Sequence, residues 1–165
     1  MVRNNVILEG KTILITGTAG FIGHNLSKRL LQSVKDCIIV GIDNMNDYYD
    51  VRLKEERLKE LSASENFIFI KGSIADKSLI EKIFREYHPH VVVNLAAQAG
   101  VRYSITNPDA YIESNLIGFY NILEACRHYG AVPVFMVQTR KYHTLPMTRW
   151  TIPYHFMQLP RKAMN

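Results

Sequence analysis

The chain has 165 residues, 47% of them hydrophobic, which suits about one domain with a real core. No apolar run is long enough to span a membrane or form a signal core, so we expect a cytoplasmic protein with no membrane partner. The net charge of +5 does not indicate a nucleic-acid partner, because residues 1–130 hold all 15 acidic residues and 15 of the 20 Lys and Arg, and the excess lies in residues 131–165.

Strand and helix patterns alternate along the first 130 residues. Short apolar runs indicate strands, and apolar residues three or four apart indicate helices, with Asp76 as a good N-cap for the third helix. In chain order we expect a strand at 12–16, a helix at 22–31, a strand at 37–42, a helix at 50–61, a strand at 67–70, a helix at 77–87, a strand at 90–95 and a helix at 108–129.

This alternation predicts an α/β fold of the Rossmann type, with a parallel sheet and helices on both faces. In the last helix, five apolar residues are expected to face the core: Ile112, Leu116, Phe119, Ile122 and Leu123.

Three glycines follow the first strand, and Asp43 follows the second. A side chain at Gly17 or Gly20 would keep a diphosphate away from the backbone, and Gly23 lets the next helix lie close on the strand with its N-terminal N–H groups facing the phosphates. The Asp43 carboxylate can accept hydrogen bonds from an adenosine ribose and would repel a 2′-phosphate. The sequence therefore predicts a dinucleotide site that favours NAD over NADP.

Polar and small residues follow the other strands, where ligands bind in parallel sheets. Arg102 would place a planar cation near the crevice, although a solvated loop arginine fits the pattern equally well. Asn115 lies among apolar residues in a helix, where its amide contacts the cofactor or fixes the loop after the fourth strand. The two cysteines, Cys37 and Cys126, and the six histidines show no metal-ligand spacing, so we expect reduced thiols and no metal.

Three segments carry a resemblance to a known family: ITGTAGFIG at residues 15–23, DNMNDYYDVRLK at residues 43–54 and NLAAQAGVRYS at residues 94–104. With these segments the chain resembles the N-terminal half of extended short-chain dehydrogenases/reductases of the nucleotide-sugar epimerase group, and is most similar to UDP-glucuronate 4-epimerases. The first segment marks the superfamily, and the other two are more specific to the glucuronate branch.

The resemblance implies a tightly held NAD that oxidises the sugar C4 hydroxyl and returns the hydride to the other face, converting UDP-glucuronate to UDP-galacturonate. It implies a UDP-sugar substrate and a homodimer in the full-length family. By position, Gln98 and Arg102 are implied substrate-binding residues. The implied cofactor-binding residues are Gly17, Gly20, Phe21, Ile22, Gly23, Asp43, Asn44, Ser73, Ile74, Leu95, Ala96, Ala97 and Asn115. Ser73 departs from the family, which usually has Asp there.

The chain stops agreeing with the family near residue 130. The family continues with a fifth strand, a catalytic Ser or Thr and a Tyr-x-x-x-Lys pair whose phenolate acts as the base. Neither Tyr142 nor Tyr154 has a lysine four residues later, so we identify no catalytic residue. We therefore expect strands one to four to be present and the fifth onward to be missing, which exposes the edge of the fourth strand.

A shifted reading frame is our hypothesis for this change. Read one nucleotide earlier, the codons of residues 131–165 permit a family-like segment that includes Tyr-x-x-x-Lys. The single-codon residues Met and Trp fix five positions in that frame as Gly, Asp, Asp, Ala and Glu, all of which match the family. We thus expect residues 131–165 to be an aberrant, poorly ordered basic tail; coding DNA with no family-like reading one base back would reject this.

The sequence therefore predicts a truncated, inactive form of a UDP-glucuronate 4-epimerase. Two alternatives stay open: another nucleotide-sugar epimerase or 4,6-dehydratase, and a non-catalytic NAD-binding module.

Overall fold

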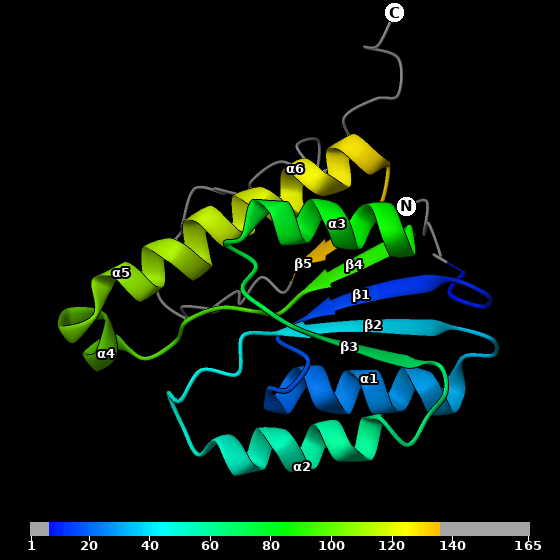
Figure 1. Ribbon diagram of the computed structural model, residues 1–165, viewed down its shortest axis with the longest axis horizontal. Coiled ribbons are helices and arrows are strands. Elements are labelled where there is room, and N and C mark those ends of the chain that lie inside the picture. The colour runs from blue at the N-terminus through cyan, green and yellow to red at the C-terminus, as the bar shows by residue number, and fades with distance from the viewer. Residues whose placement is uncertain (1–6, 136–165) are drawn as a thin grey trace, which may run out of the picture.

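A five-stranded parallel sheet with helices on both faces forms the structure, a computed structural model that describes residues 7–135 (Figure 1). Its strand order is β3-β2-β1-β4-β5, with α1 and α2 on one face and α3 and α6 on the other. The elements are β1 (Thr12–Thr16), α1 (Phe21–Ser33), β2 (Ile38–Asp43), α2 (Val51–Leu61), β3 (Phe67–Lys71), α3 (Lys77–Tyr87), β4 (Val91–Asn94), α4 (Val101–Thr106), α5 (Pro108–Tyr111), η1 (Ile112–Gly118), α6 (Phe119–Tyr129) and β5 (Val132–Phe135).

The central strands are apolar on both sides because helices cover both faces of the sheet. At the centre of β1, Leu14 pairs with Val40 of β2 and Val92 of β4, and all three side chains are buried. The Asp76 carboxylate accepts a hydrogen bond from the Leu79 N–H at 3.0 Å, so Asp76 caps α3 as expected. The predicted Rossmann-type fold class is confirmed.

The prediction that the fifth strand is missing is wrong. β5 pairs in parallel with β4, from Val91 opposite Val132 to Asn94 opposite Phe135. Strand pairing uses backbone groups that every sequence offers, and Pro133 is tolerated because β5 lies at the edge of the sheet in the described chain. The rest of the expected basic tail, residues 136–165, lies outside the described residues.

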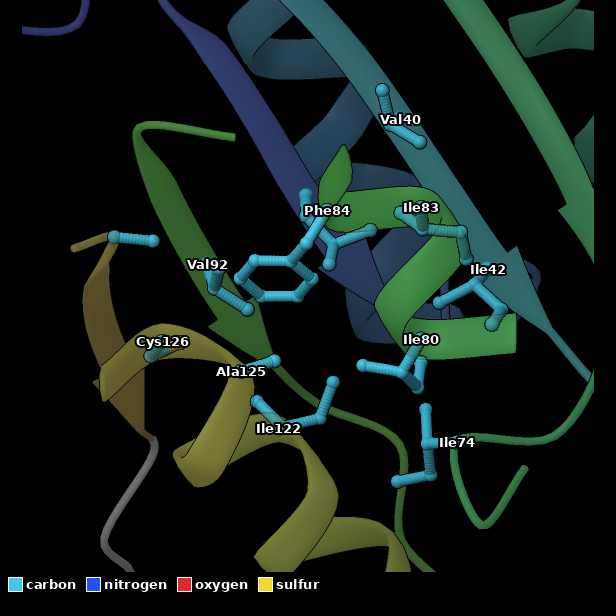
Figure 2. Close-up of a cluster of buried hydrophobic side chains, with 12 residues drawn as sticks. Val40, Ile42, Ile74, Ile80, Ile83, Phe84, Val92, Ile122, Ala125 and Cys126 are labelled. Carbon is cyan, nitrogen blue, oxygen red and sulfur yellow. The ribbon is translucent and has the colours of Figure 1, made fainter. Parts of the chain in front are cut away.

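Two apolar layers hold the helices on the sheet. The layer under α3 and α6 gathers around Phe84, with Val92 from β4 and Ile122 from α6 beside it (Figure 2). The opposite layer packs α1 and α2 on Ile13, Ile15 and Ile39. Cys126 lies in the first layer, where burial raises the pKa of its thiol to about 12. Within residues 7–135 both cysteines are free.

The long helix expected at 108–129 is three segments, of which the middle one, η1, is π-helical. Ile122 is buried as predicted, but Ile112, Leu116, Phe119 and Leu123 are exposed, Leu116 by 63%. In η1 the i→i+5 hydrogen bonds change the helical repeat, so an α-helical pattern assigns Ile112 and Leu116 to the wrong side. Phe119 and Leu123 lie on α6 and are exposed by 37% and 36%. No helix in the described part of the chain is long and apolar enough to cross a membrane.

Candidate dinucleotide-binding site

A cavity of about 230 Å³ opens at the carboxyl ends of the strands. Residues that follow β1, β2, β3 and β4 all contribute to its wall. The chain runs from β1 outward to β3 and then returns to β4 on the other side of β1, so the order of the strands reverses between β1 and β4. Ligands of open parallel sheets bind at such a reversal.

Packing within the glycine loop requires two of its glycines. Gly17 has φ +68°, and a Cβ there would lie 2.9 Å from the Ala96 nitrogen. A Cβ at Gly23 would lie 2.2 Å from the Gly17 carbonyl oxygen, so only glycine lets α1 approach the loop this closely. Gly17 and Gly20 line the cavity, which leaves the backbone of the loop open to a ligand.

The N-terminus of α1 begins beside this loop. Within residues 7–135, no side chain caps it and its first turn holds no acidic residue. The N–H groups of Phe21, Ile22 and Gly23 are therefore suited to bind a phosphate, with the helix dipole favouring negative charge. The Phe21 and Ile22 side chains are exposed and lie outside the cavity wall, so only their backbone fits the predicted role.

The buried Asp43 carboxylate joins the glycine loop to the loop after β2. It accepts hydrogen bonds from the N–H groups of Ala19 at 3.2 Å and Met45 at 2.9 Å. The Lys54 ammonium lies 3.5 Å from the same carboxylate and also donates to Asn46 Oδ1 at 2.7 Å. Asp43 is thus held in position at the cavity wall by its own protein, with a buried cation to balance its charge.

Asn44, Ser73 and Ile74 line the cavity on the side of β2 and β3. The Ser73 hydroxyl oxygen accepts a hydrogen bond from the Ala75 N–H at 3.2 Å, which keeps this turn closed. The Asn121 amide donates to the Ile74 carbonyl at 3.0 Å from α6. This side of the cavity is therefore a turn fixed to the helix behind it.

A buried threonine fixes the start of the loop after β4. Thr16 Oγ1 donates to Asn94 Oδ1 at 2.6 Å and accepts from the N–H groups of Leu95 at 3.0 Å and Ala96 at 2.9 Å. The small side chains of Ala96 and Ala97 then leave the cavity floor open.

Asn115 fixes the loop after β4, which is one of its two expected roles. Its Oδ1 accepts from the Gln98 N–H at 2.8 Å and its Nδ2 donates to the Gln98 carbonyl at 3.0 Å. Gln98 lines the cavity, whereas Asn115 and Arg102 lie outside its wall, Arg102 exposed on α4. Cofactor contact by Asn115 and substrate contact by Arg102 stay predictions.

The cavity thus brings together most of the residues expected from the sequence. Those in its wall are Gly17, Gly20, Asp43, Asn44, Ser73, Ile74, Leu95, Ala96, Ala97 and Gln98, and those outside it are Phe21, Ile22, Gly23, Arg102 and Asn115. Sequence analysis missed eight further residues of the wall: Ile42, Asn46, Tyr48, Tyr49, Lys54, Gly72, Ala99 and Ser114. The helical spacing could have indicated Lys54, since it lies four residues before Leu58 and seven before Leu61 and so shares the inward side of α2 with them. In the described range no group of His, Cys, Asp and Glu could hold a metal ion.

This fold and cavity define a Rossmann-type dinucleotide-binding domain. The model of the GDP-mannose 4,6-dehydratase family matches residues 14–144, and the chain belongs to this family. Among its relatives, protein CapI of Staphylococcus aureus is 55% identical over 118 residues, covering 72% of this chain and 34% of that protein. The UDP-glucuronate 4-epimerase of Thermodesulfobacterium geofontis is 43% identical over 126 residues, covering 76% and 38%.

Solved structures of UDP-sugar epimerases share the fold. A variant of the UDP-glucuronic acid 4-epimerase of Bacillus cereus, in complex with NAD and UDP-4-deoxy-4-fluoro-glucuronic acid, superposes with a TM-score of 0.69 at 28% identity, covering 82% of this chain and 46% of that one. The chain spans about a third of the length of the curated relatives it matches.

Proposed function

We propose that this chain is the NAD-binding N-terminal part of an NAD-dependent UDP-sugar 4-epimerase, with UDP-glucuronate as the sugar nucleotide. One observation carries the proposal: the glycine loop and the uncapped start of α1 lie next to the buried Asp43 carboxylate, at the reversal of strand order. This arrangement offers N–H groups to a diphosphate and a carboxylate to a ribose. The relatives named for UDP-glucuronate support the sugar.

We propose further that residues 1–165 do not catalyse epimerisation by themselves. They contain no tyrosine with a lysine four residues later, so the phenolate base of the family is absent from this stretch. The same absence supports the second candidate, a non-catalytic NAD-binding module. Product analysis of the protein made from a gene with the family-like reading frame restored would separate an epimerase from a 4,6-dehydratase.

Two buried free thiols in the described residues support a cytoplasmic location.

Isothermal titration calorimetry of the full chain tests the cofactor. We expect NAD to bind and NADP to bind at least tenfold more weakly, because the Asp43 carboxylate meets a 2′-phosphate. We also expect no UDP-galacturonate from UDP-glucuronate with NAD present. No heat of NAD binding by folded protein at millimolar ligand would overturn the cofactor proposal, and measurable epimerisation would overturn the proposal of inactivity.

We also propose that a second copy of the chain covers the outer side of η1 and α6. Leu116 on η1 and Tyr120 and Leu123 on α6 are exposed by 63%, 56% and 36%. Exposed apolar patches of this kind mark interaction surfaces, and the resemblance supports a homodimer. Light scattering after size exclusion should show a dimer that Leu116→Glu converts to monomer, whereas Ile105→Glu on α4 should leave it intact; a monomeric parent chain would contradict the proposal.

A further inference from the structure

Two segments of the chain meet at the wall of the cavity. The first is the loop between β2 and α2, which carries Asn46 and Tyr48. The second is the segment after β4, which carries Gln98 and Tyr103. We call the contacts between these four residues the bridge.

The bridge consists of one hydrogen bond and one ring contact. Asn46 Nδ2 donates to Gln98 Oε1 at 3.3 Å. The Tyr48 and Tyr103 rings meet edge to face, with centroids 5.0 Å apart and an interplanar angle of 61°. Such an aromatic pair contributes about 0.5 to 1.5 kcal/mol beyond its buried area.

Both ends of the bridge are anchored. On the β2 side, Asn46 Oδ1 accepts from the buried Lys54 ammonium at 2.7 Å. On the β4 side, Asn115 holds the Gln98 backbone, and the Asn107 amide donates to the Tyr103 hydroxyl at 2.8 Å. Gly100 has φ +102°, and a Cβ there would lie 2.3 Å from the Tyr48 hydroxyl, so the second loop is shaped to receive this tyrosine.

The position of the bridge follows from the order of the strands. β2 and β4 flank β1, so contacts between the loops that follow them must cross above the end of β1. The glycine loop begins there, with Gly17 and Gly20 in the cavity wall together with Asn46, Tyr48 and Gln98. A dinucleotide whose diphosphate rests on the glycine loop would therefore lie between that loop and the bridge.

We propose that Tyr48 and Tyr103 retain the bound dinucleotide: the bridge closes over the diphosphate and must open before the dinucleotide leaves. This inference rests on the proposed NAD site. Opening separates the two rings and the Asn46–Gln98 pair, so the contacts of the bridge add to the barrier for release.

Dissociation of radiolabelled NAD from the full chain, chased with excess unlabelled NAD, tests the proposal. We expect Tyr48→Ala and Tyr103→Ala each to raise the dissociation rate about 2- to 10-fold, which is the ring-pair energy expressed as a rate. The double variant should be no faster than the faster single variant, because both changes remove the same contact. Tyr48→Phe keeps the ring and should dissociate at nearly the parental rate.

Tyr129→Ala is the matched control, since the Tyr129 ring is 38% exposed, packs at a tilt against Phe84 and lies outside the cavity wall. It should leave NAD release unchanged. If Tyr48→Ala and Tyr103→Ala release NAD at the parental rate, with unchanged circular dichroism, the bridge proposal is overturned while the proposed NAD site is unaffected. Failure of the parent chain to bind NAD would overturn the proposed function, and the bridge with it.

Discussion

Replacing Gly17 by alanine should weaken NAD binding at least tenfold and lower the free energy of unfolding by about 2 to 3 kcal/mol. Two causes add. The backbone at Gly17 has φ +68°, which alanine adopts only with strain, and its Cβ would lie 2.9 Å from the Ala96 nitrogen. That neighbour is backbone held by Thr16, so it cannot move aside as a flexible side chain would. Calorimetry with NAD and urea unfolding measure the two effects.

Gly10→Ala separates these causes. Gly10 has φ +64°, but a Cβ there would meet nothing within 4 Å. It should therefore show the strain alone, about 1 kcal/mol, with NAD affinity unchanged. Equal losses in the two variants would mean that the contact with Ala96 contributes nothing and that the glycine loop tolerates a side chain.

The fold was predictable where local sequence decides it. The strand at 12–16 and the helix at 77–87 have the predicted bounds, because an apolar run and an Asp N-cap act within a few residues. Gly23 was assigned to close packing of α1 from its place in the glycine pattern after the first strand, which is also a local signal. The structure agrees, since any Cβ at Gly23 would collide with the Gly17 carbonyl oxygen.

What the sequence did not reveal depends on contacts between distant residues. β5 is a strand because β4 offers it an edge, and this holds whichever reading frame produced the segment, since pairing uses the backbone. The contact of Asn115 with the loop after β4 depends on the position of Gln98, and the bridge depends on that of Tyr103. η1 escaped prediction because its hydrogen bonds change the helical repeat.

Removing the ammonium of Lys54 should have the largest effect on stability. The Asp43 and Lys54 side chains are only 7% and 5% exposed, so Lys54→Met leaves a carboxylate buried without its cation. Breaking one side of such a pair costs about 3 to 5 kcal/mol, a large share of the stability of a domain of this size. Urea unfolding followed by circular dichroism should therefore show a much lower midpoint.

The double variant Asp43→Asn/Lys54→Met tests whether unpaired charge is the cause. An amide keeps an oxygen acceptor for the Ala19 and Met45 N–H groups, and methionine fills the space of the lysine stem. The double variant should therefore recover most of the lost stability.

Lys28→Met is the surface control. Lys28 pairs with Glu60, but both side chains are more than 40% exposed, so its removal should shift the midpoint far less. If the double variant is as unstable as Lys54→Met, the loss comes from the Lys54 contacts with Asn46 rather than from the charge of Asp43. In the proposed NAD site, Asp43 is the charged acceptor for the ribose, so the double variant should bind NAD at least tenfold more weakly even when its stability is restored.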